Sequence, residues 1–143
     1  MISAVITRPS KRGNSRTLQR RQLLLYLGEH PSWSPGSDRL VTSAALRQAD
    51  LYDELAVIDT VPGSTVRLTT DTAGDYQPAW SPDGTRIAWY RSVGGISSVT
   101  NGIWIMNADG SSPHFVVAGT RPSWSPDSKS LLYAGYNLSL IHI

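Results

Sequence analysis

The chain has 143 residues, about the size of a single domain. Apolar residues make up 40% of it and charged residues 17%, which is typical of a soluble globular protein and not of a disordered one. There is no cysteine, so a disulfide framework, a thiolate metal site and a cysteine nucleophile are all excluded. The small net charge of +2 hides an asymmetry along the chain.

The N-terminal arm, residues 1–27, holds much of the positive charge. Six of the 13 Lys and Arg residues lie within residues 1–21 without any acid, whereas residues 22–143 carry seven cations and 11 acids, a net charge of −4. The body of the protein therefore lacks the basic footprint of a nucleic-acid-binding protein. No aromatic residue separates the cations of residues 8–21, so we interpret the arm as a solvated tail or misannotated upstream sequence; binding to nucleic acid or anionic lipid is the alternative. We expect any helix here to lie around Leu18–Leu27.

The sequence has no candidate for a membrane-spanning helix. Such a helix needs about 20 apolar residues, and the best run is Leu23–Leu27. A secretory signal would need an apolar segment of about 7–15 residues after the basic one, and that segment is inadequate here. We therefore predict no membrane span, and no signal peptide is recognisable.

One motif occurs three times, and its centre is a tryptophan. Trp33, Trp80 and Trp124 are separated by 47 and 44 residues, and each follows a proline by two positions. A second feature recurs in phase, because apolar runs begin 22 residues after Trp33 and 23 after Trp80. Two features that share one period indicate a structural repeat. The repeated positions that we single out are Pro31, Trp33, Pro35, Pro78, Trp80, Pro82, Asp83, Gly84, Pro122, Trp124, Pro126 and Asp127.

Each repeat consists of short strands and turns. In the middle copy, the turn Ser81–Gly84 has proline at the second position and glycine at the fourth, and the strand-forming run Arg86–Tyr90 follows. The run Ile103–Met106 does not alternate in polarity, which indicates a strand buried on both faces. The proline before each tryptophan indicates an edge strand, because proline cannot donate to a sheet. We therefore expect four strands per repeat.

The motifs resemble the TolB-type β-propeller repeat. That repeat opens with Pro-x-Trp-Ser-Pro-Asp-Gly and continues to Met-Asn-Ala-Asp-Gly, and Gln77–Gly110 matches it nearly throughout. The third copy departs at Ser128, and the first departs at Gly36–Ser37. WD-type blades fit worse because no tryptophan here precedes Asp, and Kelch blades fit worse because only Gly94–Gly95 supplies a glycine pair. The resemblance covers roughly residues 28–136 and implies an all-β protein built from blades of four antiparallel strands.

The repeats predict an incomplete, open ring. Blades are expected at residues 28–72 and 73–118, and a partial one at 119–136 with about two strands. Known propellers close with about 4–8 blades, so we expect a fragment, or self-association that covers the open sheet faces. Residues 137–143 do not continue the blade pattern, and we expect them to be a non-native tail translated from sequencing-adapter read-through.

Candidate catalytic and metal-binding residues are few, and we interpret them as structural. The chain has no nucleophile elbow, no His-Glu-x-x-His motif and no phosphate loop. His30, His114 and His142 occupy unrelated positions, so we predict no catalytic, cofactor-binding or metal-binding residue. We interpret the repeated Asp83 and Asp127 as turn residues, and Asn107 and Asp109 in the same way. The three repeated tryptophans are expected to pack between blades, and Trp89 and Trp104 to lie in the core; a sugar-binding platform is the alternative for the repeated three.

The resemblance implies a non-enzymatic function. TolB-type proteins are bacterial periplasmic proteins of the cell envelope that bind other proteins, such as a peptidoglycan-associated lipoprotein. We therefore expect a protein-binding scaffold without cofactor or nucleic acid. The alternative is the gating propeller of a prolyl-oligopeptidase-like serine hydrolase whose catalytic domain is missing, and a propeller lyase or sensor domain is a third reading.

Overall fold

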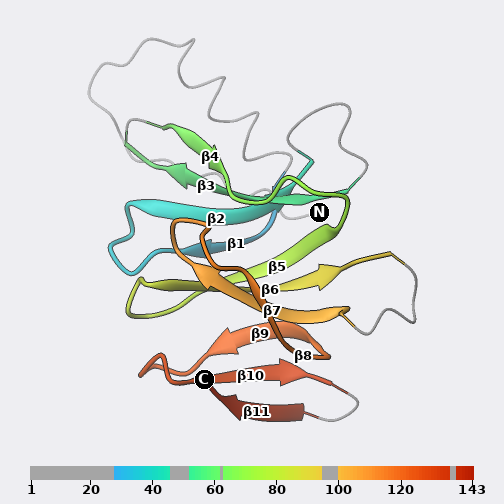
Figure 1. Cartoon of the computed structure of the whole chain (residues 1–143). Helices are drawn as coiled ribbons and strands as arrows, with labels where there is room; N and C mark the ends of the chain where they lie inside the picture. Colours follow the sequence, from blue (N-terminus) through green and yellow to red (C-terminus); the bar gives the residue numbers. More distant parts are fainter. Residues whose placement is uncertain (1–27, 46–51, 62, 95–99, 136–137) are drawn as a thin grey trace.

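The computed structural model describes residues 28–45, 52–61, 63–94, 100–135 and 138–143. Their regular structure is entirely antiparallel β-sheet, and no helix occurs among them. Nothing in this part of the chain is therefore a helical segment that could cross a bilayer. The basic arm, with its expected helix, lies outside the described residues. Figure 1 shows three sheets stacked one on the next, and the second lies between the other two.

The first two sheets have four strands each, in the order of the sequence. The strands of the first are β1 (Gly28–Trp33), β2 (Arg39–Ala44), β3 (Glu54–Asp59) and β4 (Thr65–Arg67). Those of the second are β5 (Gly74–Trp80), β6 (Arg86–Ser92), β7 (Gly102–Asn107) and β8 (His114–Val117). The proline-containing strands β1 and β5 are at sheet edges, as the sequence indicated. The predicted four-stranded antiparallel unit is thus confirmed in both sheets.

The third sheet has one more strand than the sequence led us to expect. It consists of β9 (Thr120–Trp124), β10 (Ser130–Ala134) and β11 (Leu138–His142), with β10 in the middle. The prediction of about two strands was wrong, because residues 138–142 pair with β10 in a regular register from Ser130↔His142 to Ala134↔Leu138. This segment lacks the repeat motif, but Ile141 is β-branched, a residue type that is enriched in strands.

The Ser-Pro turns close the first hairpin of each sheet in the same way. In the second sheet the N–H of Gly84 donates to the carbonyl of Ser81 (2.9 Å), and the N–H of Ser81 donates to the carbonyl of Arg86 (2.9 Å). Gly84 has a φ of 77°, in the left-handed region that glycine adopts without a steric penalty. Ser37 and Ser128 hold the same conformation, with φ of 55° and 60°. The turn therefore keeps its conformation in the first and third sheets, where serine replaces the glycine of the repeat.

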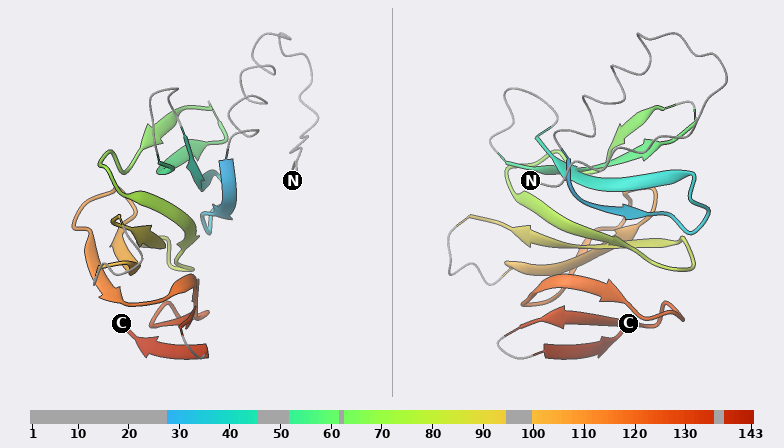
Figure 2. Two further views of the ribbon diagram at one scale, coloured as in Figure 1. Left: turned by 90° about the vertical axis from the view of Figure 1, so that its right-hand side faces the viewer. Right: turned by 180° about the vertical axis from the view of Figure 1, so that it is seen from behind.

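Two apolar clusters hold the three sheets together. Between the first and second sheets the buried residues are Val41, Leu55, Val57, Trp80, Ile87, Trp89 and Met106. Between the second and third they are Ala88, Ile103, Ile105 and Leu131. The strand β7 contributes to both clusters, so the prediction that it is buried on both faces is confirmed. Figure 2 shows the same stack from the side and from behind, and the three sheets do not close into a ring.

Candidate functional site at the first-strand edge

The first strands of the second and third sheets, β5 and β9, face the preceding sheet through their tryptophans. The Trp80 side chain is buried against the first sheet, and the guanidinium of Arg39 lies 5.0 Å from its ring centroid. One repeat later the guanidinium of Arg86 lies 4.6 Å from the ring of Trp124. Such cation–π contacts join neighbouring sheets. Between the first and second sheets a hydrogen bond is added, because the backbone N–H of Trp80 donates to Ser32 Oγ (2.9 Å). The sheets therefore dock in one repeated geometry.

Trp33 differs from the other two repeated tryptophans. It pairs in register with Leu40, on the face of the first sheet that points away from the second. Its side chain is 43% exposed, against 6% for Trp80. The expectation that all three would be packed between blades therefore does not hold for Trp33, because no described sheet lies on its side. Trp89 is fully buried and Trp104 half-buried.

The residues before the three prolines have an unusual backbone. His30, Gln77 and Arg121 have φ values of 51°, 54° and 55°, in the left-handed region. That region costs an L-residue roughly 1–2 kcal/mol. The pairing of β1 with β2 and of β5 with β6 is interrupted at these positions, as is that of β9 with β10. Each first strand therefore has a bulge at its pre-proline residue, and the bulge changes the direction of that residue's side chain in the same way in all three sheets.

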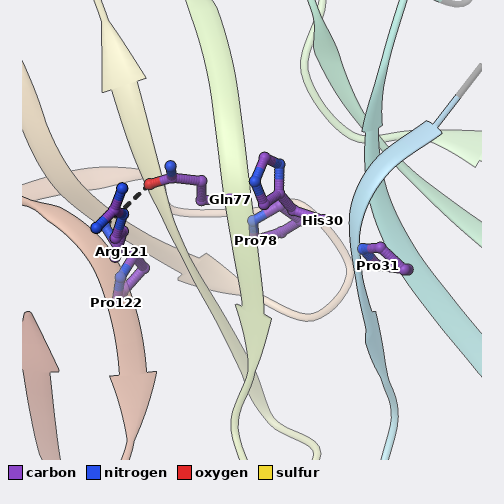
Figure 3. Close-up of a pocket in the computed structure, with 6 residues that line it drawn as sticks. All are labelled: His30, Pro31, Gln77, Pro78, Arg121 and Pro122. Carbon is purple, nitrogen blue, oxygen red and sulfur yellow. Dashed lines mark hydrogen bonds between the residues drawn. The ribbon is translucent and has the colours of Figure 1, made fainter. Parts of the chain in front are cut away.

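These three pre-proline residues and the prolines after them line one pocket (Figure 3). Its volume is about 330 Å³, and its lining is His30, Pro31, Gln77, Pro78, Arg121 and Pro122. We call it the pre-proline pocket, and the edge formed by β1, β5 and β9 the first-strand edge. The pocket spans three sheets because β5 packs against both β1 and β9. No acidic side chain from the described residues lines it.

The polar atoms of the pocket are mainly donors. Gln77 Oε1 accepts a hydrogen bond from the backbone N–H of Arg121 (3.0 Å), drawn dashed in Figure 3. The Arg121 side chain is exposed and makes no ion pair with any described residue. His30 has a side chain that is 54% exposed, with Nδ1 3.9 Å from the carboxylate of Glu29. We expected no functional role for His30, and the signal in the sequence that indicates one is the position before the proline that it shares with Gln77 and Arg121.

The recurrent acids lie in turns and bind the chain nearby. Asp83 Oδ1 accepts from Ser81 Oγ (2.6 Å) and from the N–H of Thr85 (2.9 Å), and these hydrogen bonds hold the pKa of Asp83 below its ordinary value. Asp127 accepts from Ser125 Oγ (2.6 Å), and its pKa is lowered for the same reason. Asp109 and Asn107 bond Ser111 in the second turn.

The histidines are not brought together. His30 lies on β1, His114 on β8 and His142 on β11, in three different sheets. His114 Nδ1 is 3.1 Å from the carbonyl of Ser112, and His142 Nδ1 is 3.0 Å from Ser130 Oγ. Within the described ranges, no three His, Cys, Asp or Glu side chains are arranged to hold a metal ion.

A buried ionic cluster lies where the first two sheets meet. The carboxylate of Asp75 is fully buried; its Oδ1 accepts from Trp89 Nε1 (2.6 Å) and lies 3.6 Å from Arg91 Nε. Glu54, also buried, pairs with Arg67 at 3.0 Å. Burial raises the pKa of Asp75 to about 6, although hydrogen bonds from Thr69 and Trp89 oppose the rise. The sequence analysis did not identify this cluster.

Comparison with known proteins connects this architecture to a propeller type. No known family profile matches the sequence. The chain is similar to the structure of a putative TolB from Agrobacterium tumefaciens, with a TM-score of 0.70 and 22% identity over 81% of this chain and 46% of that one. It is also similar to TolB from Acinetobacter baumannii, with a TM-score of 0.66 and 18% identity over 82% of this chain and 30% of that one. The fold is that of an open TolB-like β-propeller.

The chain is also similar in fold to part of an enzyme structure. A prolyl endopeptidase structure matches with a TM-score of 0.54 and 19% identity over 85% of this chain and 19% of that one. The chain spans less than half the length of each of these structures. The three sheets are thus successive blades of the TolB-like fold, and the third of them has three strands.

Proposed function

We propose that the chain is part of a non-catalytic protein-binding scaffold that captures its partner at the first-strand edge. The observation that carries the proposal is the variation at one strained position. A left-handed backbone is least strained with glycine, yet the three repeats hold histidine, glutamine and arginine there. A structural role alone would favour the same residue in each blade. Three different polar side chains at equivalent positions, of which His30 and Arg121 are exposed and Gln77 is half-buried, instead form a surface with its own chemistry.

The first-strand edge is built to recognise a partner through side chains. An exposed edge strand usually invites another strand to pair with it. Here Pro31, Pro78 and Pro122 remove one donor from each edge strand, and the bulges interrupt the ladder. Strand addition along this edge is therefore disfavoured, and the pre-proline pocket offers side chains for binding in its place.

The proposed partner is a bacterial envelope lipoprotein in the periplasm. This part of the proposal is supported by the resemblance of the repeats to the TolB type and by the two TolB structures of the same fold. It includes no enzymatic step.

We expect the full 143-residue chain to bind a purified peptidoglycan-associated lipoprotein in isothermal titration calorimetry. The triple variant His30→Ala, Gln77→Ala and Arg121→Ala should lose most of that binding, by about 10-fold or more in Kd, because it removes all three pre-proline side chains. The matched control is His114→Ala on β8, which should bind like the unchanged chain. Undetectable binding by the unchanged chain, or equal binding by the triple variant, would reject the proposal.

A second candidate function is the gating propeller of a serine hydrolase. The prolyl endopeptidase match favours it, because it covers more of this chain than either TolB structure does. A longer reading of the gene distinguishes the two: a Gly-x-Ser-x-Gly elbow downstream indicates the hydrolase, and an amino-terminal α/β domain indicates a TolB-type protein.

A further inference from the structure

We infer that the pre-proline pocket binds an acidic polypeptide segment, through carboxylate side chains that meet Arg121 and Gln77. The inference rests on the proposed function, because it names the chemistry of the partner at the same site. Several hydrogen-bond donors of the pre-proline pocket have no partner among the described residues. Gln77 Oε1 is already occupied by the N–H of Arg121, which leaves the two Nε2 protons of Gln77 to donate outward.

The charge of the pocket favours a carboxylate. Arg121 is the cation of the lining, and a guanidinium presents donors in a fork that matches a carboxylate. Glu29 is an acid that lies beside His30 without being part of the lining, and its side chain is 70% exposed. The side chains of His30, Gln77 and Arg121 thus give each sheet one group that can donate, and no carboxylate of a described residue is part of the lining.

The shape and the apolar part of the pocket favour a polypeptide over an acidic sugar. Pro31, Pro78 and Pro122 supply the apolar part of the lining, and Pro78 and Pro122 are buried. Among the described residues, no Trp, Tyr or Phe lines the pocket to stack on a sugar. The volume of about 330 Å³ is at the lower end of ordinary ligand sites, which suits a few residues of an extended segment.

The test is a fluorescence-anisotropy titration of the full chain with a short labelled peptide rich in Asp and Glu. A matched peptide carries Asn and Gln at every acidic position, and unlabelled oligogalacturonate serves as the competing acidic sugar. Arg121→Gln is the central variant, because it places at this position the residue that the second blade already has there in the same backbone conformation. Glu29→Gln removes the opposing charge, and Lys129→Gln, an exposed cation in a turn, is the matched control.

We expect the acidic peptide to bind about 10-fold or more tightly than the neutral one, and Arg121→Gln to abolish most of that difference. Glu29→Gln should tighten binding, and Lys129→Gln should leave it unchanged. Equal binding of the two peptides, or no effect of Arg121→Gln, overturns the inference, and so does tight binding of the sugar without the peptide. If the neutral peptide binds equally well through the pre-proline residues, the inference of an acidic partner fails but the proposed scaffold function is retained. If the lipoprotein does not bind in the calorimetric titration, the proposed function itself fails.

Discussion

Replacing Trp89 with alanine is expected to lower the free energy of unfolding by about 3–5 kcal/mol, the usual effect of removing a large aromatic side chain from a core. Trp89 is fully buried between the first two sheets, and its Nε1 is the donor that Asp75 Oδ1 accepts. The variant therefore leaves a cavity and a buried carboxylate with one hydrogen bond fewer. Urea unfolding followed by circular dichroism measures the change.

The matched control is Trp33→Ala, which removes the same side chain from a site that is 43% exposed. It should cost clearly less, because less apolar surface returns to water. If Trp89→Ala does not fold, Trp89→Phe keeps most of the ring and tests the hydrogen bond to Asp75 separately. Equal losses for Trp89→Ala and Trp33→Ala would contradict the packing of the first two sheets described above.

Acidification from pH 7 towards pH 5 is expected to stabilise the chain through Asp75. The pKa of Asp75 is about 6 in the folded chain, whereas its ordinary value, which applies to the unfolded chain, is 3.8. As the pH falls, the folded state therefore binds the proton before the unfolded state does. The stabilisation is complete below about pH 3.8 and is lost as the pH rises through about 6. The difference corresponds to about 3 kcal/mol at neutral pH. Asp75→Asn, which cannot ionise, should raise the free energy of unfolding at pH 7 and flatten its dependence between pH 7 and 5.

The control for this pH dependence is Asp127→Asn. The pKa of Asp127 is lowered by its bond from Ser125, so this carboxylate contributes stability above its ordinary pKa and loses it in acid. Its replacement should not stabilise the chain at pH 7. A destabilised Asp75→Asn variant would mean that the attraction of Arg91 to Asp75 outweighs the desolvation of the carboxylate.

The sequence predicted the repeat unit because its signals are local. Proline before tryptophan, the Ser-Pro turn and the unbroken apolar run of β7 each depend on residues close together in the chain. The same local patterns predicted too short a third sheet, since β11 lacks the motif but pairs with β10 all the same. A strand can therefore pair with its neighbour without carrying the repeat motif, provided that its residues are compatible with a sheet.

The pocket and the ionic cluster could not be predicted in this way. Asp75 and Glu54 come from different sheets, and their burial follows from how those sheets stack. His30, Gln77 and Arg121 resemble ordinary polar residues until the three bulges bring them to one place. The sequence contains their common position before the proline, but it does not predict the left-handed backbone that directs their side chains into the pocket.

The central claim, that the three blades stack with their pre-proline positions on one shared edge, is tested most directly by cysteine cross-linking. The chain has no cysteine, so a double variant carries only the two that are introduced. Gln77→Cys with Arg121→Cys should be joined efficiently by a short bis-maleimide, because Gln77 Oε1 lies 3.0 Å from the N–H nitrogen of Arg121. Gln77→Cys with Phe115→Cys on β8, at the opposite edge of the same sheet, should react poorly. Failure of the first pair, or equal yields from both, would contradict the stacked arrangement.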